Sequence, residues 1–353
     1  MKKHTKLLAI LFAFTAIFSF ISCSDNDDKK DNVSYQNGYY ILCEGVMGHN
    51  NSALDFFSTD SLKLTKDLFQ QVNSTTLGET ANDMIKLGDE LVVALTGSAS
   101  IVFVDSKTAK LDYIVNILDS NAASRQPRHL AYNKGYIYVS CFDGNIVKVN
   151  AKTKKIEAVV STQGRNPESM TIVDNKLFVA NSGGLSYPNY DTTVSIIDLT
   201  SFTLKKKLTV SPNPTIVKSH GNDVYVLSMG DYSSMPILTK INAQNNTLVD
   251  KKSIAMSDFD IYSNGTLFYI YNDYNTNKIS LKYMSSWSAA PKDFASIPQN
   301  LTTPYHIGFI NDTLYVTDAK NFTVSGEVYL FNIQTDFIKS FPCSINPNKI
   351  LLR

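Results

Sequence analysis

The sequence has 353 residues, and its 33 lysines and arginines against 32 aspartates and glutamates give a formal net charge of +1. A balance so close to neutrality gives no support to nucleic-acid binding or to adhesion to anionic surfaces. Tyrosine and phenylalanine occur 19 times each and β-branched residues recur in short runs, which favours strands over helices. Beyond the N-terminal segment remain Cys43, Cys141 and Cys343, an odd number without a Cys-x-x-Cys pair, which argues against a disulfide framework and a zinc site.

The N-terminus has the layout of a secretory signal. Lys2, Lys3 and Lys6 precede an uncharged apolar run from Leu7 to Phe20. At ~1.5 Å per residue, these 14 residues are too short to span a ~30 Å hydrocarbon core, so we expect cleavage. Residues 1–22 are therefore predicted to be a signal peptide, and their removal takes the formal charge from +1 to −2.

Cys23 is predicted to be the acylated first residue of the mature chain, because Ser22-Cys23 and the apolar residues before them resemble a bacterial lipobox. The alternative is an ordinary signal peptide in which Cys23 is incidental. The acidic segment 24–28 resembles the tag that sends lipoproteins of Bacteroides-type bacteria to the cell surface; the alternative is a solvated tether. Both interpretations give a flexible leash over residues 23–34 before a folded part over residues 35–353. The expected location is the cell surface, with a lipid anchor in the outer membrane.

A repeat runs through the folded part. Four prolines stand ten residues before the first apolar residue of a predicted strand: Pro127 before Ile137, Pro167 before Leu177, Pro214 before Val224 and Pro304 before Leu314. The same frame without proline fits Asn82 to Leu91 and Asp258 to Leu267. The aligned positions Leu91, Ile137, Leu177, Val224, Leu267 and Leu314 follow one another by 46, 40, 47, 43 and 47 residues, which is the length of a propeller blade.

Each repeat is punctuated in the same way. Turns such as Asn133-Lys134-Gly135 precede the second strand, and Asn and Gly tolerate the positive φ of tight hairpins. A third strand and a more polar fourth strand follow, so each repeat predicts a four-stranded antiparallel blade. With Tyr39–Leu42 as a further second strand, the sequence predicts an all-β, seven-bladed β-propeller. Segment 346–352 has the pattern of a leading strand and is expected to pair beside Tyr39–Leu42, which closes the ring in the first blade.

Several segments resemble known propellers. Three are similar to the YVTN-type repeat, a resemblance that extends over essentially the whole mature chain: Pro167–Met170, Leu177–Asn181 and Thr193–Asp198. Three others are similar to lipoprotein propellers of Bacteroides-type bacteria, and among these to the BtuG group of cobalamin-capturing surface lipoproteins: Cys43–Gly45, Asn50–Leu54 and the insertion Asn181–Asp191. Cys43 departs from the pattern, since an Asn commonly precedes Glu-Gly. The resemblance implies capture of cobalamin (vitamin B12) or a related corrinoid and its transfer to a TonB-dependent outer-membrane transporter.

Alternating strand direction predicts where a ligand binds, because the loops after each second strand and before each leading strand open on one face. Residues one step beyond each proline position should ring the channel mouth there: Asn82, Arg128, Glu168, Thr215, Asp258, Tyr305 and Asn348. The longer loops add further candidates: Glu44, His49, Asn181, Tyr187, Tyr190, Tyr232, Tyr274 and Phe322. Such a rim suits a large, partly apolar, hydrogen-bonding ligand. We expect about half of these residues to be turn formers or blade packing only, and His129 and His306, at matching places, to pack rather than bind metal.

The sequence contains no recognisable enzyme motif. It has no Gly-x-Ser-x-Gly elbow, no His-Glu-x-x-His and no phosphate-binding Gly-rich loop. Four acids, Glu44, Glu168, Asp258 and Asp318, would hold an ion only by converging on the channel, as in metal-dependent propeller lactonases, and the intervening Arg128 weakens this idea. Ligand capture without enzyme activity, cofactor or metal is therefore the first hypothesis. A glycan- or protein-binding module is the second, and a cryptic propeller hydrolase or lactonase the third.

Overall fold

The computed structural model describes residues 36–231, 233–273, 276, 278–295, 297–334 and 336–353. The predicted signal peptide, Cys23 and the tether lie outside these residues, as do Tyr232 and Tyr274. The described fold belongs to one compact unit, Ser34–Arg353. Among the described residues, no helix is long and apolar enough to cross a membrane.

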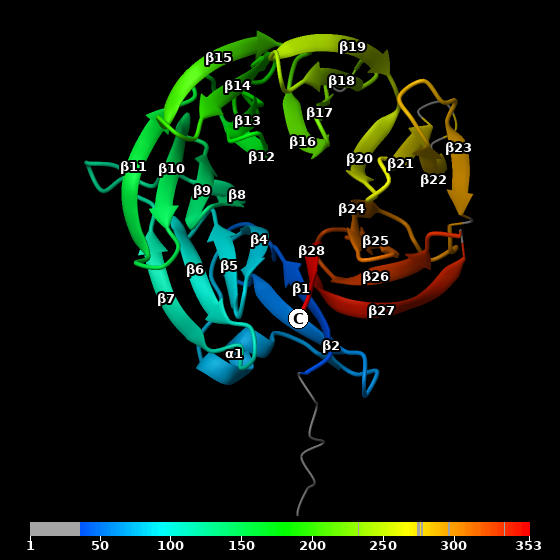
Figure 1. Cartoon of the computed structure of the whole chain (residues 1–353). Helices are drawn as coiled ribbons and strands as arrows, with labels where there is room; N and C mark the ends of the chain where they lie inside the picture. The colour runs from blue at the N-terminus through cyan, green and yellow to red at the C-terminus, as the bar shows by residue number, and fades with distance from the viewer. Residues whose placement is uncertain (1–35, 232, 274–275, 277, 296, 335) are drawn as a thin grey trace, which may run out of the picture. The chain divides into compact units, whose positions relative to one another are not determined.

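Seven four-stranded antiparallel sheets stand around a common axis, so the predicted seven-bladed propeller is confirmed (Figure 1). From the axis outwards, blade 1 contains β28 (Pro347–Leu352), β1 (Gly38–Cys43), β2 (Ala53–Ser58) and β3 (Leu64–Thr65). Blade 2 contains β4 (Ala81–Leu87), β5 (Glu90–Leu95), β6 (Ser100–Asp105) and β7 (Leu111–Asn116). Blade 3 contains β8 (Pro127–Asn133), β9 (Tyr136–Cys141), β10 (Asn145–Asn150) and β11 (Lys155–Ser161).

The remaining blades follow the same order. Blade 4 contains β12 (Pro167–Val173), β13 (Lys176–Asn181), β14 (Thr193–Asp198) and β15 (Thr203–Thr209). Blade 5 contains β16 (Pro214–His220), β17 (Asp223–Ser228), β18 (Ile237–Asn242) and β19 (Thr247–Ser253). Blade 6 contains β20 (Met256–Ile261), β21 (Leu267–Asp273), β22 (Lys278–Met284) and β23 (Lys292–Ala295). Blade 7 contains β24 (Pro304–Ile310), β25 (Thr313–Asp318), β26 (Ser325–Asn332) and β27 (Phe337–Ile345).

The C-terminal strand closes the ring, as predicted. Strand β28 pairs antiparallel with β1, with Leu352 opposite Tyr39 and Ile350 opposite Ile41. On its other sides β28 contacts the inner strands of its two neighbours, β4 and β24. Both ends of the described chain therefore share blade 1, and the inner strands form an unbroken circle (Figure 1).

The chain enters every inner strand through the same backbone contact. A residue at the end of the second strand donates its N–H to the carbonyl before the inner strand in all seven blades, for example Phe142 to Gln126 at 3.1 Å. The accepting residue has a left-handed φ in five of them: Thr80, Gln126, Asn166, Asn213 and Asn346. Asparagine tolerates this conformation better than most residues with a Cβ. The Asn-Pro pairs of the repeat therefore mark a left-handed turn followed by a strand whose first residue needs no N–H.

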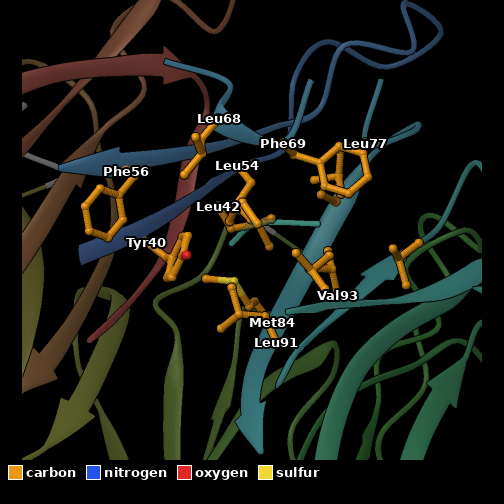
Figure 2. Close-up of a cluster of buried hydrophobic side chains, with 14 of the residues drawn as sticks. Tyr40, Leu42, Leu54, Phe56, Leu68, Phe69, Leu77, Met84, Leu91 and Val93 are labelled. Atoms are coloured by element: carbon orange, nitrogen blue, oxygen red, sulfur yellow. The ribbon is translucent and has the colours of Figure 1, made fainter. Parts of the chain in front are cut away.

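The seams between blades hold the apolar core. Figure 2 shows the seam of blades 1 and 2, where Tyr40 of β1 and Phe56 of β2 are buried with Met84 of β4 and Leu91 of β5. The aromatic rings of Tyr40 and Phe56 meet edge to face with centroids 5.1 Å apart, a favourable arrangement for aromatic pairs. The Tyr40 hydroxyl donates to the Ser106 carbonyl at 2.6 Å, so its polar end is satisfied inside the core.

One short helix, α1 (Leu68–Asn73), was not predicted. It begins after Asp67, whose carboxylate accepts a hydrogen bond from the Gln70 N–H at 3.2 Å. Such a cap satisfies one of the free N–H groups at a helix start. The helix buries Leu68 and Phe69 in the seam of blades 1 and 2 (Figure 2). It therefore completes this core where the two-residue strand β3 leaves blade 1 short.

Candidate functional site

The two faces of the ring differ in their connections. Asn133 pairs with Tyr136 where β8 turns into β9, whereas Pro127, at the start of β8, lies beside Cys141, at the end of β9. We call the first end the hairpin face. The opposite end, the loop face, carries the loops from second to third strands and those leading into the inner strands. This arrangement agrees with the prediction made from strand alternation.

A cavity of about 520 Å³ occupies the channel mouth on the loop face. Its volume lies within the range of about 300–1,000 Å³ that is usual for small-molecule sites. The predicted ring residues line it: Asn82, Arg128, Glu168, Thr215, Asp258, Tyr305 and Asn348. Glu44, which follows β1, and Met229, which follows β17, extend the wall. The structure therefore brings residues from all seven blades to one site.

The prediction for Asp258 requires a correction, because this residue lines the cavity from one place beyond the ring position. Met256 pairs with Tyr271, fifteen residues away, whereas Pro127 pairs with Cys141, fourteen residues away. The β20–β21 hairpin thus holds one extra residue, and Ser257 takes the place that corresponds to Arg128. Asp258 is only 3% exposed and accepts the Ile307 N–H at 2.9 Å, so it ties blade 6 to blade 7.

An equivalent tie joins blades 2 and 3. Asp83 accepts the Leu130 N–H at 2.9 Å, and its carboxylate lies 2.7 Å from Lys349 Nζ and 3.7 Å from His129 Nδ1. Burial opposes the charge of Asp83, but Lys349 and His129 outweigh it and hold the pKa of Asp83 well below its usual range. At the matching seam, His306 Nδ1 lies 2.6 Å from Asp258. Both histidines therefore contact the carboxylate of the preceding blade, consistent with the predicted packing role.

Arg128 offers hydrogen-bond donors to the cavity. Its Nε atom lies 3.0 Å from Glu168 Oε2, and its guanidinium stacks 4.5 Å from the Phe142 ring centroid. Within the described part of the chain, its two terminal nitrogens make no hydrogen bond. Burial acts to raise the pKa of Glu168, but Arg128 and His129 lower it overall. Glu168 thus stays charged and orients Arg128, whose free donors can bind an oxygen-rich group.

Glu44, two blades away from Arg128, is held by residues of blades 7 and 1. It accepts the Tyr305 hydroxyl at 2.7 Å and the Asn348 side-chain amide at 2.8 Å. Burial raises the pKa of Glu44, although the Tyr305 hydrogen bond acts in the other direction. Asn348 also donates to the Asn82 carbonyl at 2.6 Å. These contacts join the polar groups of blades 7, 1 and 2 into one wall of the cavity.

Exposed apolar side chains surround the mouth on four of the loops between second and third strands. They are Met47, Leu185, Tyr187, Met235, Phe322 and Val324. Tyr187 is 73% exposed and meets Tyr190 edge on, with ring centroids 6.0 Å apart. Phe322 is 47% exposed and meets Tyr305 at 5.8 Å, which connects this rim to the cavity wall. The rim therefore presents exposed apolar side chains above a cavity that is lined by both charged and apolar residues.

Five of the predicted ligand residues that the structure describes do not line the cavity: Tyr187, Tyr190 and Phe322, which stand on the loops around it, and Asn181 and His49. Asn181 is fully buried and donates to Thr193 Oγ1 at 3.0 Å and Ser195 Oγ at 2.8 Å, so it fixes the base of the long loop instead of contacting a ligand. His49 is exposed on the rim, where its Nδ1 lies 3.1 Å from the Met47 carbonyl, but it does not line the cavity. The prediction failed at Asn181 because this residue is still the end of strand β13, and the loop begins only after it.

Several cavity residues were not predicted as ligand contacts. Asp83, His129 and Lys349 stand two places beyond the proline position, and Lys218 stands four beyond it. The bulge after the first residue of the inner strand brings adjacent side chains, such as Arg128 and His129, to the same cavity. Counting two residues beyond each proline position, instead of one, would have identified Asp83, His129 and Lys349.

The predicted acids do not converge on an ion. Among the described residues, no group of three His, Cys, Asp or Glu side chains is placed to hold a metal ion. Asp318 is fully buried and accepts the N–H groups of Thr302 and Thr303, both at 2.9 Å, while Lys320 Nζ lies 2.9 Å away. Its carboxylate is therefore committed to the start of blade 7.

Solved structures share the fold at low sequence identity. A quinonprotein alcohol dehydrogenase-like protein from Bacteroides thetaiotaomicron VPI-5482 is 14% identical with a TM-score of 0.64, over 91% of this chain and 79% of that chain. A putative 6-phosphogluconolactonase from Bacteroides uniformis ATCC 8492 is 11% identical with a TM-score of 0.64, over 90% and 100%. Hydrazine synthase of Kuenenia stuttgartiensis is 14% identical with a TM-score of 0.63, over 76% and 88%. These similarities show the propeller fold alone. No curated protein matches the sequence.

A family model gives a more direct relationship. The model described as Domain of unknown function (DUF5074) matches residues 37–292. This span begins just before β1 and ends at the first residue of β23, so it takes in most of the first six blades. The chain therefore belongs to the DUF5074 family.

Proposed function

We propose that this propeller captures a small-molecule ligand on its loop face, and that the ligand is cobalamin or a related corrinoid. The observation that carries the proposal is a group of exposed apolar side chains on the loops around a cavity whose lining combines charged, polar and apolar groups. Sites for small ligands combine apolar contact area with a few placed polar groups in this way. A ligand with an apolar body and hydrogen-bonding substituents would use both parts at once.

Corrinoid chemistry suits this arrangement. The faces of a corrin macrocycle are apolar, its edge carries amide groups, and cobalamin adds a phosphodiester. A molecule of that size would lie across the rim, against Tyr187 and Phe322, with only a part entering the cavity of about 520 Å³. The free nitrogens of Arg128 are suited to a phosphate or amide oxygen. The resemblance of segments such as Cys43–Gly45 to cobalamin-capturing lipoproteins supports the same ligand.

The proposal extends to location and partner. The N-terminal pattern ending at Cys23 supports a lipid-anchored protein on the outer membrane, facing outwards. A TonB-dependent vitamin B12 transporter would then receive the ligand. Capture at the cell surface and transfer require no bond making, so the protein would act as a binding protein and not as an enzyme.

Titration calorimetry with cyanocobalamin tests the ligand, and Tyr187→Ala tests the face. Truncating a buried aromatic contact commonly costs ~2 kcal/mol, which is roughly a thirtyfold loss of affinity. Tyr187 is 73% exposed without ligand, so its removal should leave the melting temperature unchanged. The matched control is Tyr132→Ala, since Tyr132 is an exposed tyrosine near the hairpin end of β8 and should leave affinity unchanged.

Arg128→Ala completes the experiment by testing the cavity. It should also weaken binding, because it removes the cavity's free guanidinium donors. Absence of any cyanocobalamin binding would exclude the corrinoid. Loss of binding in Tyr132→Ala, with normal binding in Tyr187→Ala and Arg128→Ala, would show that the ligand uses the hairpin face.

A further inference from the structure

Two cysteines meet at the seam where the ring closes. Cys43 is the last residue of β1 in blade 1, and Cys343 lies in β27, the outer strand of blade 7. Both are buried in the same side-chain cluster, where the two thiols are close enough to interact. The chain beyond Cys343 crosses from blade 7 into β28, and Pro347 of that strand pairs with Cys43. The two cysteines therefore share one seam although 300 positions separate them in the sequence.

The surroundings fix both side chains. Cys43 and Cys343 are fully buried in one apolar cluster with Ile41, Phe341 and Ile350. Backbone contacts hold the crossing segment: Glu44 N–H donates to the Asn346 carbonyl at 2.9 Å. On the other flank, Ser344 N–H donates to Asp55 Oδ2 at 2.7 Å. The segments that carry the two cysteines are therefore held by the same contacts that close the ring.

We propose that Cys43 and Cys343 form a disulfide bond that fastens blade 7 to blade 1. The sequence argument against a disulfide framework rested on the odd number of cysteines, and it did not consider one pair with a third, separate thiol. Cys141 is that third thiol: it lies buried in blade 3, in a different apolar cluster. It serves as an internal reference for a cysteine without a partner.

The chemistry requires an oxidant. Formation of the S–S bond removes two protons and two electrons from the Cys43 and Cys343 thiols, and an exchangeable disulfide, such as oxidised glutathione or that of a thiol oxidase, is reduced to two thiols. Burial raises the pKa of the Cys43 thiol, which keeps it from reacting as a thiolate once the seam is packed. The bond therefore forms while the chain folds, before blade 1 closes on blade 7.

The bond would act on the same element as β28. A cross-link between residues 43 and 343 encloses almost the whole propeller, and long enclosed loops lose the most conformational entropy in the unfolded chain. It would hold the two ends of the ring together even if β28 detached from β1. The disulfide and the C-terminal strand thus fasten one seam by covalent and non-covalent means.

The test is a count of free thiols in the full chain carrying Cys23→Ala, refolded with a mixture of oxidised and reduced glutathione. This change removes the cysteine of the N-terminal segment, and the same background serves as the wild type for the variants below. The product is unfolded without reductant, alkylated with iodoacetamide and analysed by peptide mass spectrometry. The expected result is alkylation at Cys141 and a linked peptide pair containing Cys43 and Cys343. Alkylation of Cys43, Cys141 and Cys343 together, in a product that has the circular dichroism of the folded protein, would overturn the proposal.

Cys43→Ala/Cys343→Ala is the matched variant, and Cys141→Ala is its control. Reductant should lower the melting temperature of the oxidised wild type and of Cys141→Ala, and leave that of the double variant unchanged. Equal melting temperatures of the wild type with and without reductant would overturn the role of the bond in fastening the seam. None of these readouts involves ligand binding, so they do not depend on the proposed function.

Discussion

His129 joins three blades through two carboxylates. Its Nδ1 lies 3.7 Å from Asp83 of blade 2 and its Nε2 lies 3.6 Å from Glu168 of blade 4. Burial acts to lower the pKa of His129, but the two carboxylates outweigh burial and raise it above its ordinary value. The protonated imidazole of His129 thus links two neighbouring seams of the ring. When the imidazole loses its proton, the two buried carboxylates lose one compensating positive charge.

This arrangement makes the stability depend on pH. A histidine whose pKa is raised by folding stabilises the protein fully below its unfolded pKa of about 6.5, and the contribution is lost as the pH rises through the folded value. In thermal melts, His129→Asn should therefore destabilise the protein most at pH 6 and progressively less towards higher pH. Ile114→Ala, an exposed uncharged change on β7, should give a difference from the wild type that is constant with pH. A constant difference for His129→Asn as well would contradict the assigned role.

For single residues, the sequence repeat predicted where a side chain stands in the ring better than which partners it contacts. The fixed interval from proline to second strand located Arg128, Glu168 and Tyr305 at the channel mouth, because each blade repeats the same turn and bulge. It failed at Asp258, where one additional hairpin residue shifted the frame. The partners of these side chains come from neighbouring blades, as Glu44 and Tyr305 show. No pattern within one repeat contains that information.

Among the elements, the turns into the inner strands are the most regular. Asn346, before β28, has a φ of 55° and donates its side-chain amide to the Gly45 carbonyl at 2.7 Å and the Phe322 carbonyl at 3.3 Å. One residue thus joins the closing strand to the β1–β2 and β25–β26 loops. Asparagine provides both the left-handed backbone and the amide donor, which explains why the repeat uses it here.

The two contributions can be separated by substitution. Asn346→Gly loses the two hydrogen bonds but keeps the left-handed φ free of strain, and should cost about 1–2 kcal/mol of unfolding free energy. Asn346→Ala loses the hydrogen bonds and also strains the left-handed backbone, so it should cost about 1 kcal/mol more than Asn346→Gly. Urea unfolding measures the two values. An alanine variant as stable as the glycine variant would show that backbone conformation contributes nothing at this turn.

Element prediction succeeded where local chemistry decides the structure. Hairpins such as Lys134-Gly135 have positive φ, as their sequence indicated. Helix α1 was missed because its six residues form too short a segment to show an amphipathic period, and packing of Leu68 and Phe69 stabilises it. Asn181 was misassigned because the border between strand and long loop is set by its contacts with Thr193 and Ser195.

For the whole molecule, blade counting predicted the ring because closure leaves little freedom. Six full repeats and one lacking its leading strand require the C-terminal segment to supply that strand, and β28 does so against β1. The ligand could not be obtained from the same reasoning. The rim side chains, such as Tyr187 and Phe322, stand in loops that differ from blade to blade, so the repeat carries no information about them.

Closure by β28 predicts that the ring depends on its last residues. Deleting residues 346–353 would remove Ile350, which is 1% exposed, and leave the inner edge of β1 unpaired. Burying one such side chain is worth ~1.5–3 kcal/mol, and an open strand edge invites pairing between molecules. The truncated protein should melt at a markedly lower temperature and aggregate in size-exclusion chromatography.

A permuted chain distinguishes the effect of losing strand β28 from the effect of shortening the chain. Leu352 pairs with Tyr39, and Arg353 N–H donates to the Gly38 carbonyl at 3.1 Å, so the end of β28 lies beside the start of β1. Residues 346–353 can therefore be moved ahead of β1 and joined to it by a short glycine-containing hairpin, with the same antiparallel pairing. This permutant should regain the melting temperature and the monomeric elution that the truncation loses. If the truncated chain has the melting temperature of the wild type, β28 does not hold the ring. If truncation lowers the melting temperature and the permutant does not restore it, closure depends on the connection from β27 to β28, where Cys343 and Asn346 lie.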